Sequence, residues 1–265
     1  MGDFQRLRRY PGLKVVLAAY GTPGIMAMES LFGLGVPSSG IRLLTHKRDS
    51  RNAALLDFAA ANDIRIMTGE PDTKSVFARI KKFQPDLLFS LHYRRRIPRA
   101  ILTLPKLGCI NLHPSLLPEY RGCFSVPWAL INGERVTGYT YHYMDHSFDT
   151  GKIITQKAVR ILGTDTAFSL FHRLIAEGMK SFEDVLEKVL QGRARGSAQR
   201  GEGSYYPRKL PYNGRIDRGW THARIDRFIR AMIFPPYKGA VLRAGGKLHE
   251  VRSLQDYRHF IRKYK

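Results

Sequence analysis

Three polar residues stand where they could carry out acyl transfer. Asn111 and His113 are two residues apart at the end of the strand-like segment GCINLH (108–113), so their side chains project from one face. Asp149 follows later, immediately before a Thr-Gly turn. An amide can donate to a developing oxyanion, an imidazole can accept a proton, and a carboxylate can orient and charge that imidazole. These three residues are therefore our catalytic candidates.

Each candidate also has a structural interpretation. A single histidine at a strand end is more often structural than catalytic, an aspartate before Thr-Gly usually stabilises the turn, and Asn111 can cap a loop. The residue types by themselves indicate acyl transfer of an undefined kind, so the elements that position them have to be considered.

Short apolar segments alternate with amphipathic segments in the first part of the chain. This alternation predicts parallel β-α-β units in a doubly wound sheet, whose ligands bind beyond the carboxyl ends of the strands. Asn111 and His113 lie at such an end. The predicted strands are 13–20, 40–46, 64–67, 86–92 and 108–113, and the predicted helices are 23–35, 51–63 and 73–83.

The pattern changes after residue 135. We expect two strands at 135–144 and 152–161, then one long helix at 166–192. A Gly-, Ser- and Arg-rich segment follows, then a tail with a helix at 221–232 and a hairpin whose tip is Gly-Gly. We therefore predict an α/β fold with a mainly parallel sheet and a small C-terminal helix and β-hairpin extension. The predicted divisions are a catalytic domain at 1–192, a linker at 193–204 and an extension at 205–265.

The composition is that of an ordinary globular protein, with 43% hydrophobic and 25% charged residues. No apolar run approaches the roughly 20 residues of a membrane helix, and we see no export signal, so we expect a cytoplasmic protein without membrane insertion. Cys109 and Cys123 are interpreted as two buried small hydrophobic residues.

The net charge of +22 is the unusual global property. It favours a polyanionic partner such as nucleic acid, a nucleotide-linked sugar, polyglutamylated folate or an anionic membrane surface. The basic residues are dispersed, with local clusters at 6–9, 47–51, 94–96 and 262–265. A solvated basic surface is the alternative interpretation.

Several separated segments resemble the formyltetrahydrofolate-dependent formyltransferases. They are NLHPSLLPEYRG (111–122), WALINGE (128–134), TGYTYHYMD (137–145) and DTGKIITQ (149–156), in the order and spacing of that family. The resemblance implies a Rossmann-like domain, 10-formyltetrahydrofolate as formyl donor, no metal, and Asn111, His113 and Asp149 in the catalytic positions. It also implies that the folate heterocycle binds largely through backbone groups, which we assign to Tyr93, Arg94, Arg96, Met144 and Asp145.

The tail resembles that of the sugar N-formyltransferases in SYYPRKLPYNGRIDRGW (204–220) and IRAMIFPPYKGAV (229–241). This implies a nucleotide-linked amino sugar, of the dTDP-4-amino-4,6-dideoxyhexose type, as acceptor, for surface polysaccharide such as the O-antigen of lipopolysaccharide, and a homodimer. A diphosphate and a base would need cationic and aromatic partners. Our candidates for these substrate contacts are Tyr205, Tyr206, Arg208, Lys209 and Trp220.

Other functions remain open at this point. A methionyl-tRNA formyltransferase would suit the positive charge, but that family ends in a larger barrel domain than 205–265 can form. A UDP-4-amino-arabinose formyltransferase shares the tail motif. A basic RNA-binding protein on a Rossmann-like domain is the non-enzymatic alternative, and it would leave the three catalytic candidates without a role.

Overall fold

The computed structural model describes residues 9–264, so the basic cluster at 6–9 lies outside the described residues except for Arg9. A seven-stranded sheet has the strand order β3-β2-β1-β4-β5-β7-β8. The pairs β1–β2, β2–β3, β1–β4 and β4–β5 are parallel, whereas β7 runs antiparallel to β5. The prediction of an α/β fold with a mainly parallel sheet is confirmed.

The chain forms two compact units. One contains the residues up to His113 together with Thr140–Thr155 and Ala176–Gln199, and the other contains Pro114–Tyr139, Gln156–Ile175 and the residues from Arg200 onward. All the predicted catalytic and folate residues belong to the first unit, and all the predicted substrate residues belong to the second.

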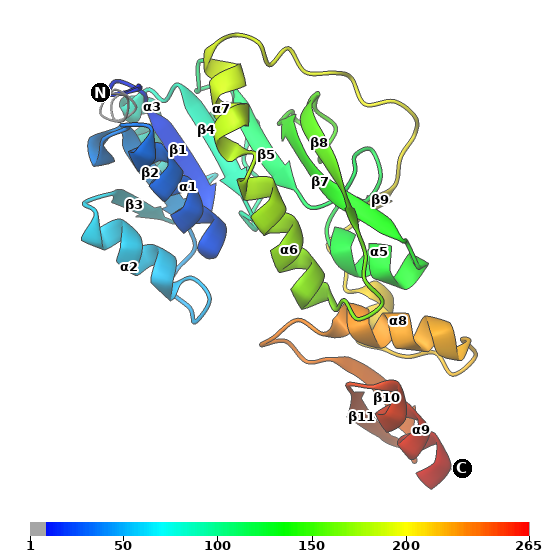
Figure 1. The fold of residues 1–265 in the computed structure, drawn as a ribbon. Coiled ribbons are helices and arrows are strands. Elements are labelled where there is room, and N and C mark those ends of the chain that lie inside the picture. The colour runs from blue at the N-terminus through cyan, green and yellow to red at the C-terminus, as the bar shows by residue number, and fades with distance from the viewer. Residues whose placement is uncertain (1–8, 265) are drawn as a thin grey trace, which may run out of the picture. The chain divides into compact units, whose positions relative to one another are not determined.

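The elements up to the fifth strand follow the predicted alternation closely (Figure 1). Parallel strands buried on both faces read as continuous apolar runs, which is why the sequence pattern locates them well. In order they are β1 (Val15–Ala19), α1 (Thr22–Gly33), η2 (Ser38–Gly40), β2 (Ile41–Thr45), α2 (Ala53–Ala61), β3 (Arg65–Thr68), α3 (Lys74–Phe83), β4 (Leu87–Leu91), α4 (Arg99–Leu102) and β5 (Cys109–His113).

The remaining elements include several short ones that the sequence pattern did not indicate. They are β6 (Arg121–Gly122), α5 (Ser125–Asn132), β7 (Val136–Tyr143), β8 (Ile153–Arg160), α6 (Ala167–Met179), α7 (Phe182–Leu190), β9 (Tyr205–Tyr206), η3 (Pro211–Gly214), α8 (His222–Met232), β10 (Ala240–Ala244), β11 (Lys247–Val251) and α9 (Leu254–Lys263).

Helix α3 shows how the first unit forms its core. The hydroxyl of Thr73 accepts the backbone N–H of Val76 at the amino end of the helix, which supplies an N-cap. Val76, Ile80 and Phe83 then recur at helical spacing and are buried. They pack against the sheet in a cluster with Val16, Ala18, Leu44, Met67, Leu88, Ile97, Ile101 and Cys109. Burial raises the pKa of the Cys109 thiol to about 12, whereas Cys123 is only half-buried.

The prediction of one helix over 166–192 is wrong, because the segment contains two helices, α6 and α7. The break lies at Ser181, whose backbone N–H bonds to the Gly178 carbonyl three residues earlier, at 2.9 Å. The same carbonyl accepts the hydroxyl of Tyr141 at 3.1 Å. A tertiary hydrogen bond at the break therefore competes with continuation of the helix, which periodicity does not reveal.

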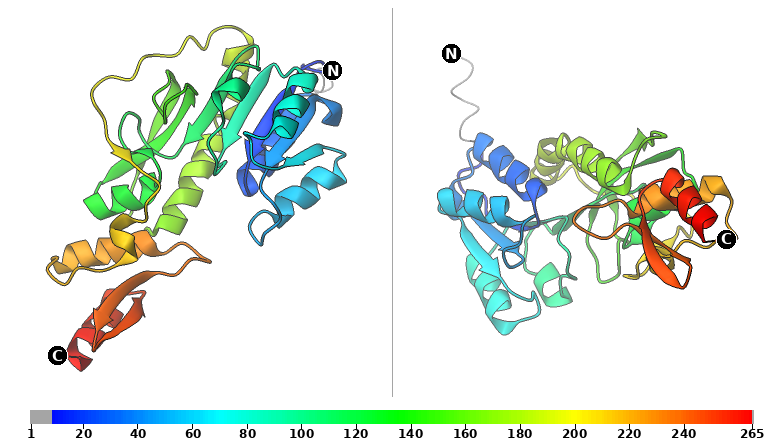
Figure 2. Two further views of the ribbon diagram at one scale, coloured as in Figure 1. Left: turned by 180° about the vertical axis from the view of Figure 1, so that it is seen from behind. Right: turned by 90° about the horizontal axis from the view of Figure 1, so that it is seen from below.

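The second unit contains the predicted tail helix, α8, and the predicted hairpin, β10–β11. Figures 1 and 2 show a further helix, α9, lying along this hairpin. Its start follows a capping pattern, since the Ser253 hydroxyl accepts the N–H of Asp256 at 3.0 Å. Within residues 9–264, no helix is both long and apolar enough to cross a membrane.

Candidate active site

The catalytic candidates meet at the carboxyl end of β5. In the antiparallel pairing of β5 with β7, Asn111 lies opposite His142 and His113 lies opposite Thr140. Both histidines are buried, with 4% of His113 and 1% of His142 exposed. The strand end therefore holds two imidazoles and an amide inside the first unit.

Asp149 faces these groups from the turn between β7 and β8. Its Oδ1 accepts an N–H of the Asn111 amide at 3.3 Å and lies 3.4 Å from Nε2 of His142. Its Oδ2 lies 3.6 Å from Nδ1 of His113, and 15% of the aspartate side chain is exposed. The structure thus brings together all three residues that the sequence singled out.

His142 is a fourth member of this cluster that we did not predict. Its Nδ1 donates to the carbonyl of Tyr143 at 2.8 Å, which places the proton on Nδ1 in the neutral ring. Its Nε2 then accepts the second N–H of the Asn111 amide at 3.1 Å. A histidine between two tyrosines in the strand VTGYTYHY was the available sequence signal.

The turn that carries Asp149 is held from two sides. Thr150 donates its hydroxyl to Asp145 at 2.8 Å, and the side chain of Gln199 donates to the carbonyls of Asp149 and Gly151 at 2.7 and 2.9 Å. Asp149 itself has a φ of 56°, a left-handed conformation that aspartate tolerates better than most residues. These contacts fix the position of the carboxylate.

Gly151 explains the Thr-Gly pair after Asp149. A Cβ at this position would lie 1.8 Å from the carbonyl oxygen of Tyr143, closer than any side chain allows. Only glycine permits this approach of the turn to β7. Asp145 belongs to the same turn and accepts the N–H of Ser147 at 3.0 Å, so its side chain has a structural role here.

The loop after β4, which contains three of the residues predicted to bind folate, contacts this turn. Arg96 donates to the carbonyl of His146 at 2.9 Å, and its guanidinium lies 5.3 Å from the centre of the Phe148 ring. Tyr93 and Met144 are partly buried and pack against the core under α3. Burial raises the pKa of Tyr93 to about 12.

Two of the expected backbone donors already have partners inside the protein. The N–H of Arg94 donates to Nε2 of His46 at 3.3 Å, and the N–H of Met144 donates to the carbonyl of Cys109 at 2.8 Å. A heterocycle bound here would therefore meet these two residues through groups other than their amide hydrogens.

The predicted substrate residues lie in the second unit. Tyr205 is 52% exposed, while Tyr206 stacks on Trp128 at a centroid distance of 4.6 Å. Trp220 is half-buried, with the Arg224 guanidinium 4.6 Å from its ring centre. Trp220 also packs within the unit, with its ring centre 4.8 Å from that of Tyr212 and 5.1 Å from that of Phe228, so Tyr205 is the most exposed of the three aromatic candidates. Arg208 and Lys209 are exposed.

Known proteins support the chemistry that this geometry suggests. The sequence profile of the formyl transferase family matches residues 46–186. GDP-perosamine N-formyltransferase of Brucella melitensis is 46% identical over 252 residues, which are 95% of this chain and 97% of that protein. Methionyl-tRNA formyltransferase of Pelotomaculum thermopropionicum is 40% identical over 174 residues, covering 66% of this chain and 55% of that protein.

The fold agrees with these matches. The X-ray structure of a sugar N-formyltransferase from a Shewanella species superimposes with a TM-score of 0.73 at 21% identity, covering 91% of this chain and 96% of that one. An amide, two imidazoles and a carboxylate gathered at the end of β5 are suited to transfer of an acyl group to an amine. The chain belongs to the formyl transferase family.

Proposed function

We propose that the protein transfers the formyl group of 10-formyltetrahydrofolate to the amine of a nucleotide-linked amino sugar. The observation that carries this proposal is the convergence of Asn111, His113, His142 and Asp149 at one strand end. A non-enzymatic RNA-binding protein would have no need for this buried and mutually hydrogen-bonded set.

The extent of similarity along the chain favours one class of acceptor. The GDP-perosamine N-formyltransferase matches 95% of the chain, tail included, whereas the methionyl-tRNA formyltransferase matches 66%. This favours an amino sugar over a tRNA. It also favours a GDP-linked sugar of the perosamine type over the dTDP-linked sugar that we expected from the sequence. Surface polysaccharide, such as the O-antigen of lipopolysaccharide, is the corresponding destination of the product.

The residues around the cluster fit a folate donor. Tyr93 and Met144 offer partly buried apolar surface, and the 93–96 loop contacts the turn at 145–148 through Arg96. A flat heterocycle with polar edges requires this combination of apolar walls and nearby backbone groups. We therefore assign Tyr93, Arg94, Arg96, Met144 and Asp145 to the folate site. The bound donor supplies the formyl group.

The roles of the cluster follow from its hydrogen bonds. Both N–H groups of the Asn111 amide are engaged, one with His142 and one with Asp149 at the longer distance of 3.3 Å. We propose that the longer bond is exchanged for one to the formyl oxygen as that oxygen gains negative charge. His142 keeps the amide oriented through the bond that remains.

Asp149 and His113 act in the transfer of a proton from the amine to the folate nitrogen. The attacking amine must lose a proton when its nitrogen bonds to the formyl carbon, and the folate nitrogen must gain one when it leaves. His113 holds this proton between the two events, and the carboxylate 3.6 Å from its Nδ1 stabilises the charged ring. No proton is gained or lost overall.

The remaining expectations are also proposals. We assign Tyr205, Arg208, Lys209 and Trp220 to the sugar-nucleotide contacts, with Tyr206 supporting them by packing. Three further points stay predictions: the homodimer, the cytoplasmic location, and the division of the chain into 1–192, 193–204 and 205–265. Light scattering of the purified protein tests the dimer.

The direct test is an acceptor panel with 10-formyltetrahydrofolate, followed by the release of tetrahydrofolate. The panel contains GDP-perosamine, a dTDP-4-amino-4,6-dideoxyhexose, UDP-4-amino-arabinose and methionyl-tRNA. We expect the highest kcat/KM with GDP-perosamine. Preference for methionyl-tRNA would refute the sugar assignment, and absence of turnover with every amine would refute the proposed reaction.

A further inference from the structure

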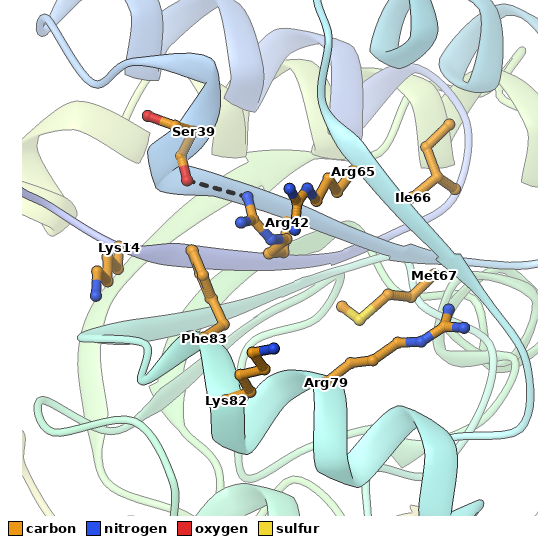
Figure 3. Close-up of a pocket in the computed structure, with 9 residues that line it drawn as sticks. All are labelled: Lys14, Ser39, Arg42, Arg65, Ile66, Met67, Arg79, Lys82 and Phe83. Carbon is orange, nitrogen blue, oxygen red and sulfur yellow. Dashed lines mark hydrogen bonds between the residues drawn. The ribbon is translucent and has the colours of Figure 1, made fainter.

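A pocket lies in the first unit at the amino ends of β1, β2 and β3, whereas His113 lies at the carboxyl end of the parallel strand β5. Its volume is about 690 Å³, within the range of small-molecule sites. Figure 3 shows side chains from three neighbouring strand starts and from helix α3 around it. The lining residues are Lys14, Ser39, Arg42, Arg65, Ile66, Met67, Arg79, Lys82 and Phe83.

The sheet register places three of the cationic residues on one face. Arg42 of β2 is the direct partner of Arg65 of β3 and of Val16 of β1. Lys14 precedes Val16 by two residues and so projects to the same side. This is the face that α3 covers, because Leu44 and Met67, two residues beyond Arg42 and Arg65, belong to the core under that helix.

Helix α3 supplies the other wall. Arg79, Lys82 and Phe83 recur at spacings of three and four and therefore share one side of the helix. Phe83 ends the apolar core, and the Arg42 guanidinium lies 4.2 Å from the centre of its ring. The pocket is thus a continuation of the core space in which cations replace apolar side chains.

The positive charge of the side chains that line the pocket is not balanced by carboxylates in the lining. Five of its nine residues are cationic, no acidic residue lines it, and none of the five cations forms an ion pair with any part of the chain that the structure describes. The carboxylate nearest in sequence to the α3 wall, Asp86, accepts the backbone N–H of Lys14 and pairs with Lys106 instead.

The excess of positive charge is unfavourable between Arg42 and Arg65. The two guanidinium groups are like charges at paired positions of the parallel strands β2 and β3, so they repel each other. Burial, and then the charge of Arg65, lower the pKa of Arg42. The only hydrogen-bond partners of the Arg42 side chain within residues 9–264 are the carbonyls of Ser39 and Ile41, at 3.0 and 2.8 Å. An anion between the two arginines would remove this repulsion.

We propose that this pocket binds a compact polyanion that carries two or more phosphate groups. Five cations converge on one concavity, from β2, β3, helix α3 and the residue that precedes β1, which suits several charges held close together. A nucleic acid would instead require cations spread along a phosphate backbone. The ring of Phe83 and the side chain of Met67 add apolar surface on the face that α3 covers.

The test is isothermal titration calorimetry of the protein of residues 1–265 with inorganic tripolyphosphate at low and at physiological salt. Two double variants change different walls: Arg42→Gln with Arg65→Gln on the strands, and Arg79→Gln with Lys82→Gln on the exposed side of α3. The matched control, Arg243→Gln with Arg258→Gln, removes the same charge from exposed residues outside the pocket. Circular dichroism and thermal melting check that each variant is folded.

We expect saturable binding of one tripolyphosphate, weakened at least about tenfold by each pocket pair and less than about twofold by the control. In the absence of the anion, the variant with Arg42→Gln and Arg65→Gln should melt close to the wild type, because loss of the repulsion between the arginines offsets loss of the Arg42 contacts with Phe83 and the two carbonyls. Lack of saturable binding up to millimolar concentrations, or equal weakening by the control, would overturn the proposal.

Two further arms identify the source of the phosphate groups. Tighter binding of GTP than of tripolyphosphate, lost in both pocket pairs, would support the proposal and assign a nucleotide as the ligand. A 20-nucleotide RNA that binds through the pocket residues and that tripolyphosphate does not displace would overturn the compact-ligand proposal. Formyl transfer, measured in parallel, reports on the catalytic cluster alone, so failure of either proposal is recognised separately.

Discussion

The substitution Asp149→Asn is the sharpest test of the catalytic cluster. Asparagine keeps the shape of the side chain and removes its charge, and it tolerates the φ of 56° found at this position. The bond from Asn111 to Oδ1 can be retained by the new amide oxygen. What is lost is the charge 3.6 Å from Nδ1 of His113.

The size of the effect follows from this distance. Two unit charges 3.6 Å apart interact by about 4 to 5 kcal/mol at an effective dielectric constant of about 20. If this energy is available when His113 carries the proton, and each 1.36 kcal/mol corresponds to about tenfold in rate, the loss is about a thousandfold. This lies within the range of about 10² to 10⁴ that general acid–base groups contribute.

The assay is tetrahydrofolate release with the best acceptor of the panel, from which kcat and KM are obtained separately. We expect kcat to fall about a thousandfold, with a melting temperature close to that of the wild type. Asp72→Asn, at an exposed carboxylate, is the matched control and should keep full activity. A folded Asp149→Asn protein that loses less than about tenfold in kcat/KM would refute the role of the charge.

Other substitutions test the turn, its support and a titrating surface group. Gly151→Ala places a Cβ 1.8 Å from the Tyr143 carbonyl and should lower the free energy of unfolding by about 3 kcal/mol or more, measured by urea titration. In the control Gly163→Ala the new Cβ has no atom within 4 Å, so the free energy of unfolding should change by less than about 1 kcal/mol. Gln199→Leu removes two hydrogen bonds to carbonyls of the catalytic turn and should reduce kcat about tenfold with little change in melting temperature; an unchanged kcat would remove Gln199 from the positioning set. Desolvation lowers the pKa of His172 in the folded protein, so the unfolded chain binds a proton at this residue more readily, and the stability of the fold falls as pH drops below about 6.5. In the His172→Gln variant the melting temperature should therefore depend less on pH between about pH 7 and 5. Equal declines of the melting temperature in the variant and the wild type would contradict this.

The local order of elements was accessible from the sequence where strands are buried on both faces. Segments such as 13–20 and 86–92 contain continuous apolar runs, and the structure places β1 and β4 inside them. Helix α9 was missed because few of its residues are apolar, although Ser253 and Asp256 formed a recognisable cap. The α6–α7 break was missed because a contact distant in sequence causes it.

The candidate site likewise contains residues that the sequence predicted and one that only the structure revealed. Asn111, His113 and Asp149 stood out through their types and flanking residues, and the structure brings them together. His142 joins them only because β7 pairs with β5 in the register that sets it opposite Asn111. Periodicity along one strand contains no information on the register between two strands.

The sequence by itself therefore determined the fold class, the kind of chemistry and the three candidate residues that the structure brings together at one strand end, because buried strands and their flanking polar residues are local features. Tertiary structure alone decided which groups surround Asp149, because the pairing of β5 with β7 and the support from Gln199 join residues far apart in the chain. It also revealed the cationic pocket, whose residues come from three strand starts and a helix. In the sequence these charges look dispersed, and only the parallel register of β1, β2 and β3 places them around one space.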